Sequence, residues 1–532
     1  MSRRSTLARI VIHSLTVREI FISVTFVSAV ALKVDRGVSP SVPEGEVIVE
    51  LYEVSPPLAY AVVTRDRRTG RMMYRVLEPS LTQQESLALA EVKRLLLESQ
   101  RPALEDIRRK GVEEVLRERV RHVVKRFKLP VHEDALDKLF YYVKRDMLGY
   151  GPLDVLVKDP RIEDISCDGV GVPVYVWHNR FESLPTNVVF NSPEELESVV
   201  VRLSHRAGKH ISVANPIVEG SLPEGYRLHA TLSEISRKGG SFTIRKFREV
   251  PFSIIDLLRL GTVSLELAAY LWLVVEARRS LMVVGATASG KTTTLNAVAT
   301  FIRPEAKIVT IEETPELNLP HENWVPLVAR PSTDPWARSV TLFDLLKSAL
   351  RMRPDYIIVG EVRGEEAFTL FQAIATGHAG MCTMHAENVD YAVKRLVSEP
   401  MKVPSFLIPL MNVILTIKRV QVGETIARRV MEVREMIFGG DGVEGHVVFR
   451  FNLSSNRIER VAESKLLESI AEERFIPVSE LVEEVERRQS ILRFLLERNV
   501  TDFARVSRVV RDYAVRPLAV YSAIERGLYD IR

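Results

Sequence analysis

The sequence contains very little cysteine. Cys167 and Cys382 are the only two cysteines in 532 residues, and no C-x-x-C pair occurs. Neither a cysteine-based zinc site nor a disulfide framework is therefore indicated, and a reducing compartment fits this composition.

The sequence also lacks an excess of charge of one sign. Its 73 Lys and Arg residues oppose 69 Asp and Glu residues, which leaves a net charge of +4. This balance does not by itself indicate a nucleic-acid partner. Aromatic residues make up only 7% of the chain, and we find no cluster that interleaves aromatic with basic residues, as binding to single strands would require.

No uncharged run reaches the length of a membrane-spanning helix. The run Ile20 to Leu32 follows Arg3, Arg4 and Arg9 and ends in small residues, which resembles a secretory signal peptide. It is shorter than the roughly 20 residues that a spanning helix needs. Its Val, Ile, Phe and Thr content favours a strand. We favour a buried strand or an upstream extension over a membrane or export signal.

The overall composition is that of a globular protein, with 46% hydrophobic and 27% charged residues. A chain of this length holds about three domains. We predict a variable, partly helical and basic N-terminal region, then a mixed α/β domain, an α/β domain with a parallel sheet, and a C-terminal extension made of a hairpin and helices. The predicted boundaries are 1–128, 129–250, 253–440 and 441–532.

The most informative stretch is Leu281 to Thr294. Four apolar residues predict a buried strand, the pattern G-x-x-x-x-G-K-T follows, and an amphipathic run then predicts a helix. In such a P-loop, glycines let backbone N–H groups face phosphate oxygens, and the helix N-terminus favours the same anions. Lys291 would contact the β- and γ-phosphates of ATP, and the Thr292 hydroxyl would bind Mg²⁺. The predicted nucleotide-binding residues are Gly285, Ala286, Thr287, Ala288, Ser289, Gly290, Lys291, Thr292 and Thr293.

Apolar strands alternate with helical stretches from residue 253 to about residue 440. This alternation predicts a parallel sheet with helices on both faces, in which ligands bind at the carboxyl ends of the strands. The predicted strands are Leu281–Val284, Lys307–Ile311, Tyr356–Val359 and Met381–Met384.

Polar residues follow these strands. We expect one edge of the sheet to carry the P-loop, carboxylates, an arginine and two histidines, which are parts that ATP hydrolysis uses. Glu361 follows the apolar run Y-I-I-V-G, 70 residues after Lys291, and is the candidate for orienting the attacking water. The other residues at this predicted edge are Glu312, Glu313, Glu316, Arg363, His385 and, just before the last strand, His378.

The remaining segments carry weaker patterns. Residues 34–80 predict short strands, and residues 83–128 predict charged helices whose basic faces we interpret as solvated surface, with an acidic partner or anionic lipid as the alternative. Residues 133–148 predict a helix, and Ser192 is expected to cap another. Strands are expected at Asp164–Asp168, Pro173–Trp177, Asn187–Phe190, His210–Val213, Tyr226–Leu232 and Ser241–Phe247.

The C-terminal segment predicts a hairpin near residues 446–453 and two amphipathic helices. The first spans Ser479 to Asn499, and Thr501 is expected to cap the second. We interpret these helices as a packing appendage, with a docking surface as the alternative.

Four motifs together resemble a known family. The P-loop, I-E-E-T-P-E-L (311–317), R-P-D-Y-I-I-V-G-E-V-R-G (353–364) and G-H-A-G-M-C-T-M-H-A (377–386) are similar to the four boxes of the secretion-superfamily ATPases. These enzymes drive type II secretion, type IV pili and the archaellum. Residues 145–153, 164–169 and 222–232 resemble the N-terminal domain of the archaeal branch, so that the resemblance covers roughly residues 130–440.

The resemblance implies roles for particular residues. Glu361 matches the glutamate of the Walker B box, and His378 and His385 match a histidine box that senses the γ-phosphate. Glu312 and Glu316 fall in the acidic box, with Glu313 where the family often has Asp.

The resemblance also bears on the metal. The position four residues before Glu361 is Ile357, which is not acidic. Mg²⁺ would therefore rely on Thr292, Glu312 and Glu361. The tetracysteine zinc insert of many bacterial members is absent.

The resemblance implies a RecA-like P-loop core that is preceded by an α/β N-terminal domain, and it implies that the protein assembles as a homohexamer. Arg227 and Arg245 are candidates for N-terminal arginines that reach the nucleotide. The implied function is a cytoplasmic motor ATPase that lies against the inner face of the membrane, acts on a polytopic platform protein, and binds no nucleic acid. The alternatives are a RecA-like nucleic-acid translocase and a nucleotide-binding scaffold without hydrolysis; intact Lys291 and Glu361 argue against the scaffold.

Overall fold

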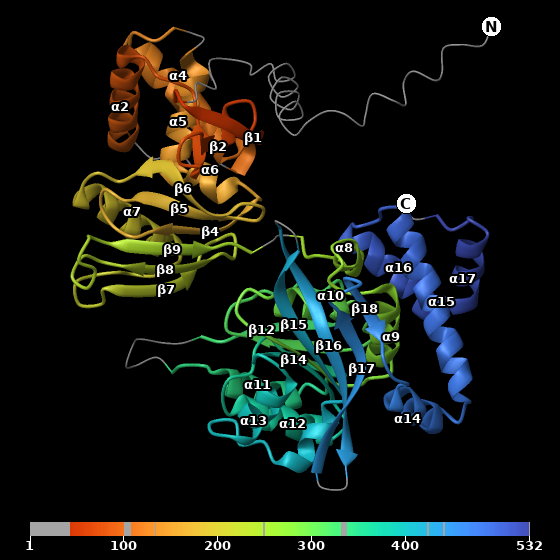
Figure 1. The fold of residues 1–532 in the computed structure, drawn as a ribbon. Helices are drawn as coiled ribbons and strands as arrows, with labels where there is room; N and C mark the ends of the chain where they lie inside the picture. The colour runs from red at the N-terminus through yellow and green to blue at the C-terminus, as the bar shows by residue number, and fades with distance from the viewer. Residues whose placement is uncertain are drawn as a thin grey trace, which may run out of the picture. The chain divides into compact units, whose positions relative to one another are not determined.

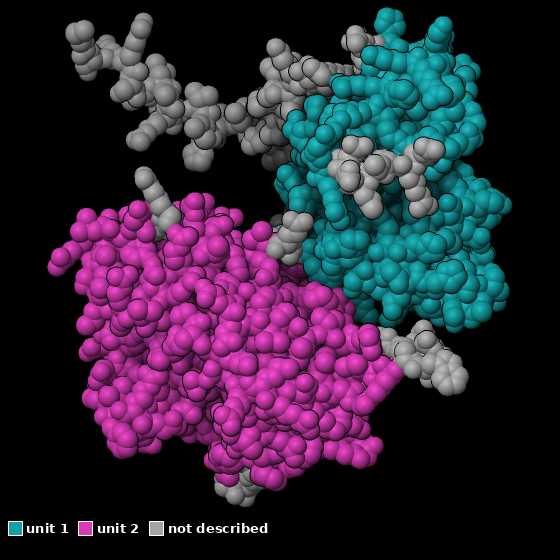
Figure 2. Space-filling view, turned by 180° about the vertical axis from the view of Figure 1, so that it is seen from behind, with its two compact units in different colours: residues 1–247 teal, residues 248–532 magenta. Residues whose placement is uncertain are grey.

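The computed structural model describes residues 43–99, 108–132, 135–247, 250–330, 338–422, 425–439 and 442–530. The apolar run 20–32 lies outside the described residues. The chain divides into two compact units, residues 1–247 and 248–532 (Figures 1 and 2). Each unit contains its own nine-stranded sheet.

The sheet of unit 1 has the strand order β1-β2-β3-β6-β5-β4-β9-β8-β7 and is mainly antiparallel. Its first three strands confirm the short strands predicted upstream of residue 80. The strands are β1 (Glu46–Ser55), β2 (Ala59–Asp66), β3 (Met72–Leu77), β4 (Ile162–Cys167), β5 (Pro173–His178), β6 (Glu182–Val189), β7 (Ile217–Ser221), β8 (Arg227–Thr231) and β9 (Ser241–Arg245).

One predicted strand of unit 1 is wrong. Residues 210–213 form no strand, because the chain turns there through a single bridge between Ser212 and Asn215 before Pro216, and β7 begins at Ile217. The predicted cap of α7 (Pro193–Arg206) is confirmed, since the Ser192 side chain accepts from the N–H of Glu195.

The other helices of unit 1 form a small bundle beside the first strands. Buried Leu and Val side chains of three helices make its core, which confirms the helical prediction for this region. These helices are α2 (Gln83–Glu98), α4 (Val112–Arg126) and α5 (Leu136–Met147), and the short α6 (Asp154–Lys158) follows them.

The sheet of unit 2 has the order β12-β11-β13-β14-β10-β15-β16-β17-β18. Its first six strands in this order are parallel and its last three are antiparallel additions (Figure 1). The strands are β10 (Leu281–Gly285), β11 (Ile308–Glu312), β12 (Trp324–Val328), β13 (Tyr356–Val359), β14 (Ala379–His385), β15 (Val413–Val422), β16 (Thr425–Gly439), β17 (Gly442–Asn452) and β18 (Arg457–Arg460).

Helices cover both faces of this sheet, as predicted. Alternate residues of β10 point to opposite faces: Leu281 and Val283 join one hydrophobic core, while Met282 and Val284 join the other. The predicted α/β class is therefore confirmed. The helices are α8 (Ile254–Arg259), α9 (Leu265–Glu276), α10 (Lys291–Ala299), α11 (Leu342–Leu350), α12 (Glu366–Ala375) and α13 (Val389–Val397), with the 3-10 turn η4 (Ser405–Leu410).

The C-terminal segment is more helical than predicted. Four helices follow β18 instead of two, and Asp502 rather than Thr501 caps α16, because the Asp502 side chain accepts from the N–H of Arg505. They are α14 (Lys465–Arg474), α15 (Val478–Glu497), α16 (Phe503–Val515) and α17 (Pro517–Glu525). None of the described helices is long and apolar enough to cross a membrane.

Helix α9 joins these C-terminal helices to the sheet. Nine consecutive residues, Leu267 to Val275, are buried, so the helix is covered on all sides. Apolar residues of α15 and α16 share one core with β10 and α9.

A buried ion-pair network crosses this contact. Arg488 of α15 is 3% exposed; it lies 2.9 Å from Glu276 of α9 and donates to Glu484 at 2.8 Å. Its guanidinium lies 5.1 Å from the ring centre of Trp272 and 5.7 Å from that of Tyr513.

We expect Arg488→Met to lower the free energy of unfolding of unit 2 by about 3 kcal/mol, because Glu276 and Glu484 would keep their burial and lose this cation. Arg487→Met is the matched control. Arg487 also contacts Glu484 but is more exposed, so its loss should cost less than about 1 kcal/mol. Urea unfolding followed by tryptophan fluorescence measures both, and equal losses would contradict the prediction.

Candidate functional site

The P-loop connects the end of β10 to the start of α10. Gly290 has φ +94° and the non-glycine residue Ala288 has φ +59°, so the loop turns twice through the left-handed region. A Cβ on Gly285 would lie 2.4 Å from the carbonyl oxygen of Ile417, which leaves no room for a side chain. The loop leads directly into the N-terminus of α10, whose backbone N–H groups and helix dipole favour the binding of a phosphate group.

Lys291 folds back onto this loop. It is 7% exposed, its Nζ donates to the carbonyl of Ala286 at 3.0 Å, and it lies 3.4 Å from Nδ1 of His385. His385 is brought there by strand pairing, because Gly285 and His385 are partners across β10 and β14.

A row of charged side chains continues from His385 across the sheet. Nε2 of His385 lies 3.4 Å from Oε1 of Glu361, and Arg363 donates to Oε2 of Glu361 at 2.7 Å. The other end of the Arg363 guanidinium donates to Glu313 at 3.1 Å. Oε1 of Glu361 is buried and makes no hydrogen bond with any residue that the structure describes. The side chains at or just after the carboxyl ends of β11, β13 and β14 thus meet beside the P-loop.

The protonation states of this row follow from its contacts. Burial alone would raise the pKa of Glu361, but the hydrogen bond and charge of Arg363, with His385 and Lys291, lower it. Burial and the charge of Lys291 lower the pKa of His385 despite the nearby carboxylate. At neutral pH an ionised carboxylate therefore faces a neutral imidazole. Such a pair can accept a proton from water or orient it.

Glu312 is more deeply buried than the other candidate carboxylates. It is 3% exposed, and burial raises its pKa to about 7. Its Oε1 accepts from the N–H groups of Glu316 and Leu317 at 3.0 and 3.1 Å, so that it holds the loop after β11. The catalytic and metal-binding roles of Glu312 stay predictions, while the neighbouring Glu313 is the carboxylate that reaches Arg363.

The prediction that both histidines lie at one edge is wrong for His378. His378 precedes β14 and His385 ends it, so the two residues lie at opposite edges of the sheet, about 20 Å apart along the strand. Nδ1 of His378 lies 3.1 Å from the carbonyl of Ala373, at the end of α12. A residue that precedes one of the parallel strands lies at the amino edge of the sheet. The P-loop follows β10 and lies at the carboxyl edge.

The two candidate arginines of unit 1 are neighbours. Arg227 and Arg245 are directly opposite each other on β8 and β9. Like charges in this position repel. Arg227 lies 3.8 Å from Glu219, and Arg245 is paired in register with Asp164 of β4. Their contact with a nucleotide stays a prediction.

One residue at the P-loop was not predicted. Nε of Arg428, in β16, donates to the carbonyl of Ala288 at 3.2 Å. The two residues are 140 positions apart, and only the pairing of β10, β15 and β16 brings them together. The consecutive arginines in A-R-R-V (427–430) were the available sequence signal, because one of two adjacent strand residues must face the opposite side from the other.

The residues present fit a Mg²⁺ ion that arrives with a nucleotide. Mg²⁺ is usually held by one or two protein oxygens and by substrate phosphates. Thr292 stands in the first turn of α10, and Oε1 of Glu361, which lies 3.4 Å from Nε2 of His385, is an oxygen ligand candidate in the same row of contacts. Ile357 is fully buried within β13 and offers no oxygen ligand from its side chain.

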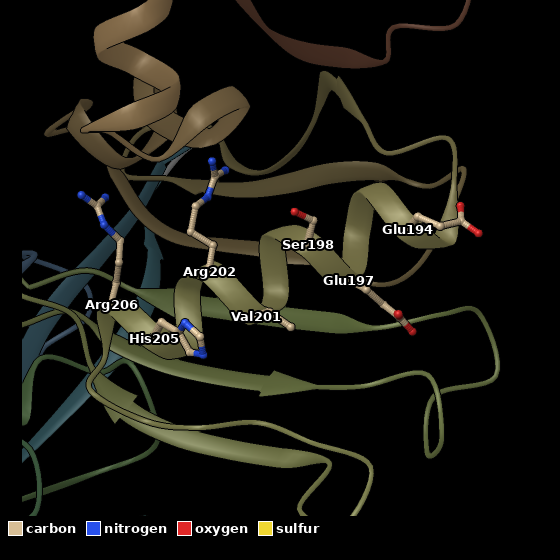
Figure 3. A pocket seen from close by; sticks show the side chains of 7 residues that line it. All are labelled: Glu194, Glu197, Ser198, Val201, Arg202, His205 and Arg206. Carbon is tan, nitrogen blue, oxygen red and sulfur yellow. The ribbon is translucent and has the colours of Figure 1, made fainter. Parts of the chain in front are cut away.

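A separate hollow of about 650 Å³ lies along α7 in unit 1 (Figure 3). Arg202 and Arg206 on its rim donate to backbone carbonyls of residues 146–150, at the end of α5. These arginines therefore stabilise a helix terminus. The hollow is lined by Glu194, Glu197, Ser198, Val201, Arg202, His205 and Arg206, and includes no predicted site residue.

The chain matches one family model and is similar to several known proteins. The family model described as "Type II/IV secretion system protein" matches residues 156–437. The uncharacterized protein MJ0900 of Methanocaldococcus jannaschii is 40% identical over 393 residues, which cover 72% of this chain and 71% of the relative. A putative conjugal transfer protein of Mycobacterium tuberculosis is 33% identical over 254 residues, 46% of this chain and 71% of the relative. Among solved structures, the VirB11 ATPase of the Brucella suis type IV secretion system has 25% identity and a TM-score of 0.28, and covers 53% of this chain and 92% of that chain.

Proposed function

Because the chain belongs to the type II/IV secretion ATPase family, we propose that it is the motor ATPase of a membrane-bound assembly: a type II secretion-like system, a type IV pilus or an archaellum. The observation that carries this proposal is the continuous row Lys291, His385, Glu361, Arg363 and Glu313 beside a P-loop.

In the proposed mechanism, each side chain of this row has a separate task. Lys291 leaves the carbonyl of Ala286 and contacts the β- and γ-phosphates of ATP, while the N-terminus of α10 holds their oxygens. Glu361 orients the attacking water, since its unbonded oxygen is free to accept from it. Mg²⁺ bound near Thr292 and Glu361 would supply positive charge to the phosphates.

His385 would link nucleotide state to conformation. It touches both the lysine and the carboxylate, so that a γ-phosphate between them changes the contacts of all three groups. Contacts that exist only with ATP bound favour one arrangement of the two units, and hydrolysis releases them. Arg227 and Arg245 of unit 1 are proposed to reach the nucleotide in that arrangement.

We further propose a homohexamer that acts in the cytoplasm on a polytopic platform protein at the inner face of the membrane. The family model, which is described as a type II/IV secretion system protein, supports work within a secretion assembly. The regions 1–128, 129–250, 253–440 and 441–532 remain our proposed functional divisions. In this division the ATPase sequence motifs fall in the third region.

The test measures Mg²⁺-dependent ATP hydrolysis by the full chain, together with particle mass, with and without nucleotide and with anionic vesicles. We expect hydrolysis, and a nucleotide-promoted particle six times the mass of the chain. A chain that binds ATP and hydrolyses none, with or without vesicles, would contradict the motor and favour a scaffold. Salt-dependent binding to single-stranded DNA would instead favour a translocase.

A further inference from the structure

The β15–β16 hairpin extends beyond the strand that carries the P-loop. β15 runs parallel to β10, with Val284 opposite Thr416. The pairing of β15 with β16 shifts register after Thr416 and then continues as far as Val422, past the end of β10 at Gly285. The hairpin therefore stands beside the P-loop.

The contact between hairpin and loop is close and specific. Nε of Arg428 donates to the carbonyl of Ala288 at 3.2 Å. A Cβ on Gly290 would lie 3.1 Å from Cδ of Arg428 and 3.7 Å from Cδ1 of Ile417, so little free space remains between them. The carbonyl that Arg428 holds belongs to Ala288, the non-glycine residue of the loop with a positive φ.

The next residue fixes the backbone of Arg428. Arg429 is 8% exposed, and its Nη1 donates to the carbonyls of Leu260 and Arg428 at 2.7 and 3.0 Å. The N–H of Val430 donates to the carbonyl of Thr262 at 2.9 Å. The strand is thus tied to the turn between α8 and α9, so that Arg428 extends from a braced backbone.

Arg428 reaches the loop from the flank opposite to the charged row. In the sheet, β14 and β13 lie on one side of β10 and bring His385 and Glu361, whereas β15 and β16 lie on the other. If the charged row faces the γ-phosphate, Arg428 acts near the opposite end of the nucleotide.

We propose that Arg428 is a positioning residue for the P-loop: its hydrogen bond to Ala288 holds the strained loop in the conformation that binds phosphate. This inference rests on the proposed function of the P-loop as the nucleotide site. Because Arg428 stands away from the charged row, its loss lowers the affinity for ATP and ADP alike and leaves turnover at saturating ATP nearly unchanged.

Three substitutions at this position separate the hydrogen bond from the charge. Gln places a side-chain N–H at the position of the arginine Nε but carries no charge. Lys keeps the charge and places its donor one atom further out. Met fills similar space and offers neither. Arg457→Met removes an exposed arginine from β18 of the same sheet and is the control for charge alone.

The experiment titrates each full-length variant with fluorescent ATP and ADP analogues, and adds kcat, KM and thermal melting. We expect Arg428→Met to raise both Kd values about three- to tenfold, the effect of one net hydrogen bond, with KM following and kcat within about twofold. Arg428→Gln should restore most of the affinity, Arg428→Lys should remain weak, and Arg457→Met should bind as the wild type does.

Other outcomes overturn the inference. Wild-type affinity in Arg428→Met contradicts any role. If Arg428→Lys restores the nucleotide affinity and Arg428→Gln does not, Arg428 contacts the nucleotide directly through its charge and does not act by positioning the loop. A melting temperature that falls together with affinity in all three variants indicates a structural role only. A wild-type chain that binds neither nucleotide overturns the proposed function as well, which distinguishes the two failures.

Discussion

A Glu361→Gln chain is expected to bind ATP as the wild type does and to hydrolyse it about 10²–10⁴ times more slowly, the usual contribution of a positioned base. Gln has nearly the same shape and keeps an oxygen at this position. It loses the negative charge, which Arg363, His385 and Lys291 help to maintain by lowering the pKa of this carboxyl group.

Single-turnover hydrolysis and nucleotide titration measure the two halves of this prediction separately. Glu365→Gln is the matched control, because Glu365 is an exposed carboxylate four residues further along the chain, at the start of α12. Equal loss of turnover in both variants would contradict the role of Glu361. Loss of ATP binding in Glu361→Gln would show that this carboxylate supports the site rather than the chemical step.

Lys291→Ala is expected to raise the Kd for ATP by about 100-fold and to abolish measurable turnover. Lys291 is 7% exposed and its ammonium group donates to the carbonyl of Ala286 in the loop, so its charge would act on phosphate oxygens with little screening. The substitution also removes the contact with His385 through which that histidine would sense the nucleotide.

Isothermal titration of the full chain with ATP in Mg²⁺ measures this effect. Lys347→Ala is the control, since it removes an exposed lysine from α11 in the same unit. Affinity that survives in Lys291→Ala would mean that the N-terminus of α10 alone holds the phosphates. ADP should be affected less than ATP, because it lacks the γ-phosphate.

The features that sequence reasoning predicted well are those defined within a few residues. The P-loop is one local pattern between a strand and a helix, and Glu361 ends a single apolar run, so both could be assigned to one sheet edge without knowledge of the fold. The same reasoning failed for His378, because a residue that precedes a parallel strand lies at the amino edge of the sheet, whereas the site is built from residues at the carboxyl ends.

Contacts made by strand pairing over long separations could not be predicted. The bond between Arg428 and Ala288 depends on strand order, on the register of β15 and on the shift after Thr416. Likewise, the pairing of Arg227 with Arg245 requires the register of β8 and β9. Each is a property of the assembled sheet. The arginine pair at 428–429 indicates that one of the two side chains faces away from the other, but it does not identify Ala288 as the partner.

The complete burial of α9 has a practical meaning for protein engineering. A shortened chain that stopped near residue 440 would expose Trp272 and the apolar surface now covered by α15 and α16, and would leave Glu276 without Arg488. Such a fragment should aggregate, although it retains every ATPase motif. A minimal motor, or a chimera that exchanges tails between homologues, must therefore carry the last helices along or redesign the outer face of α9.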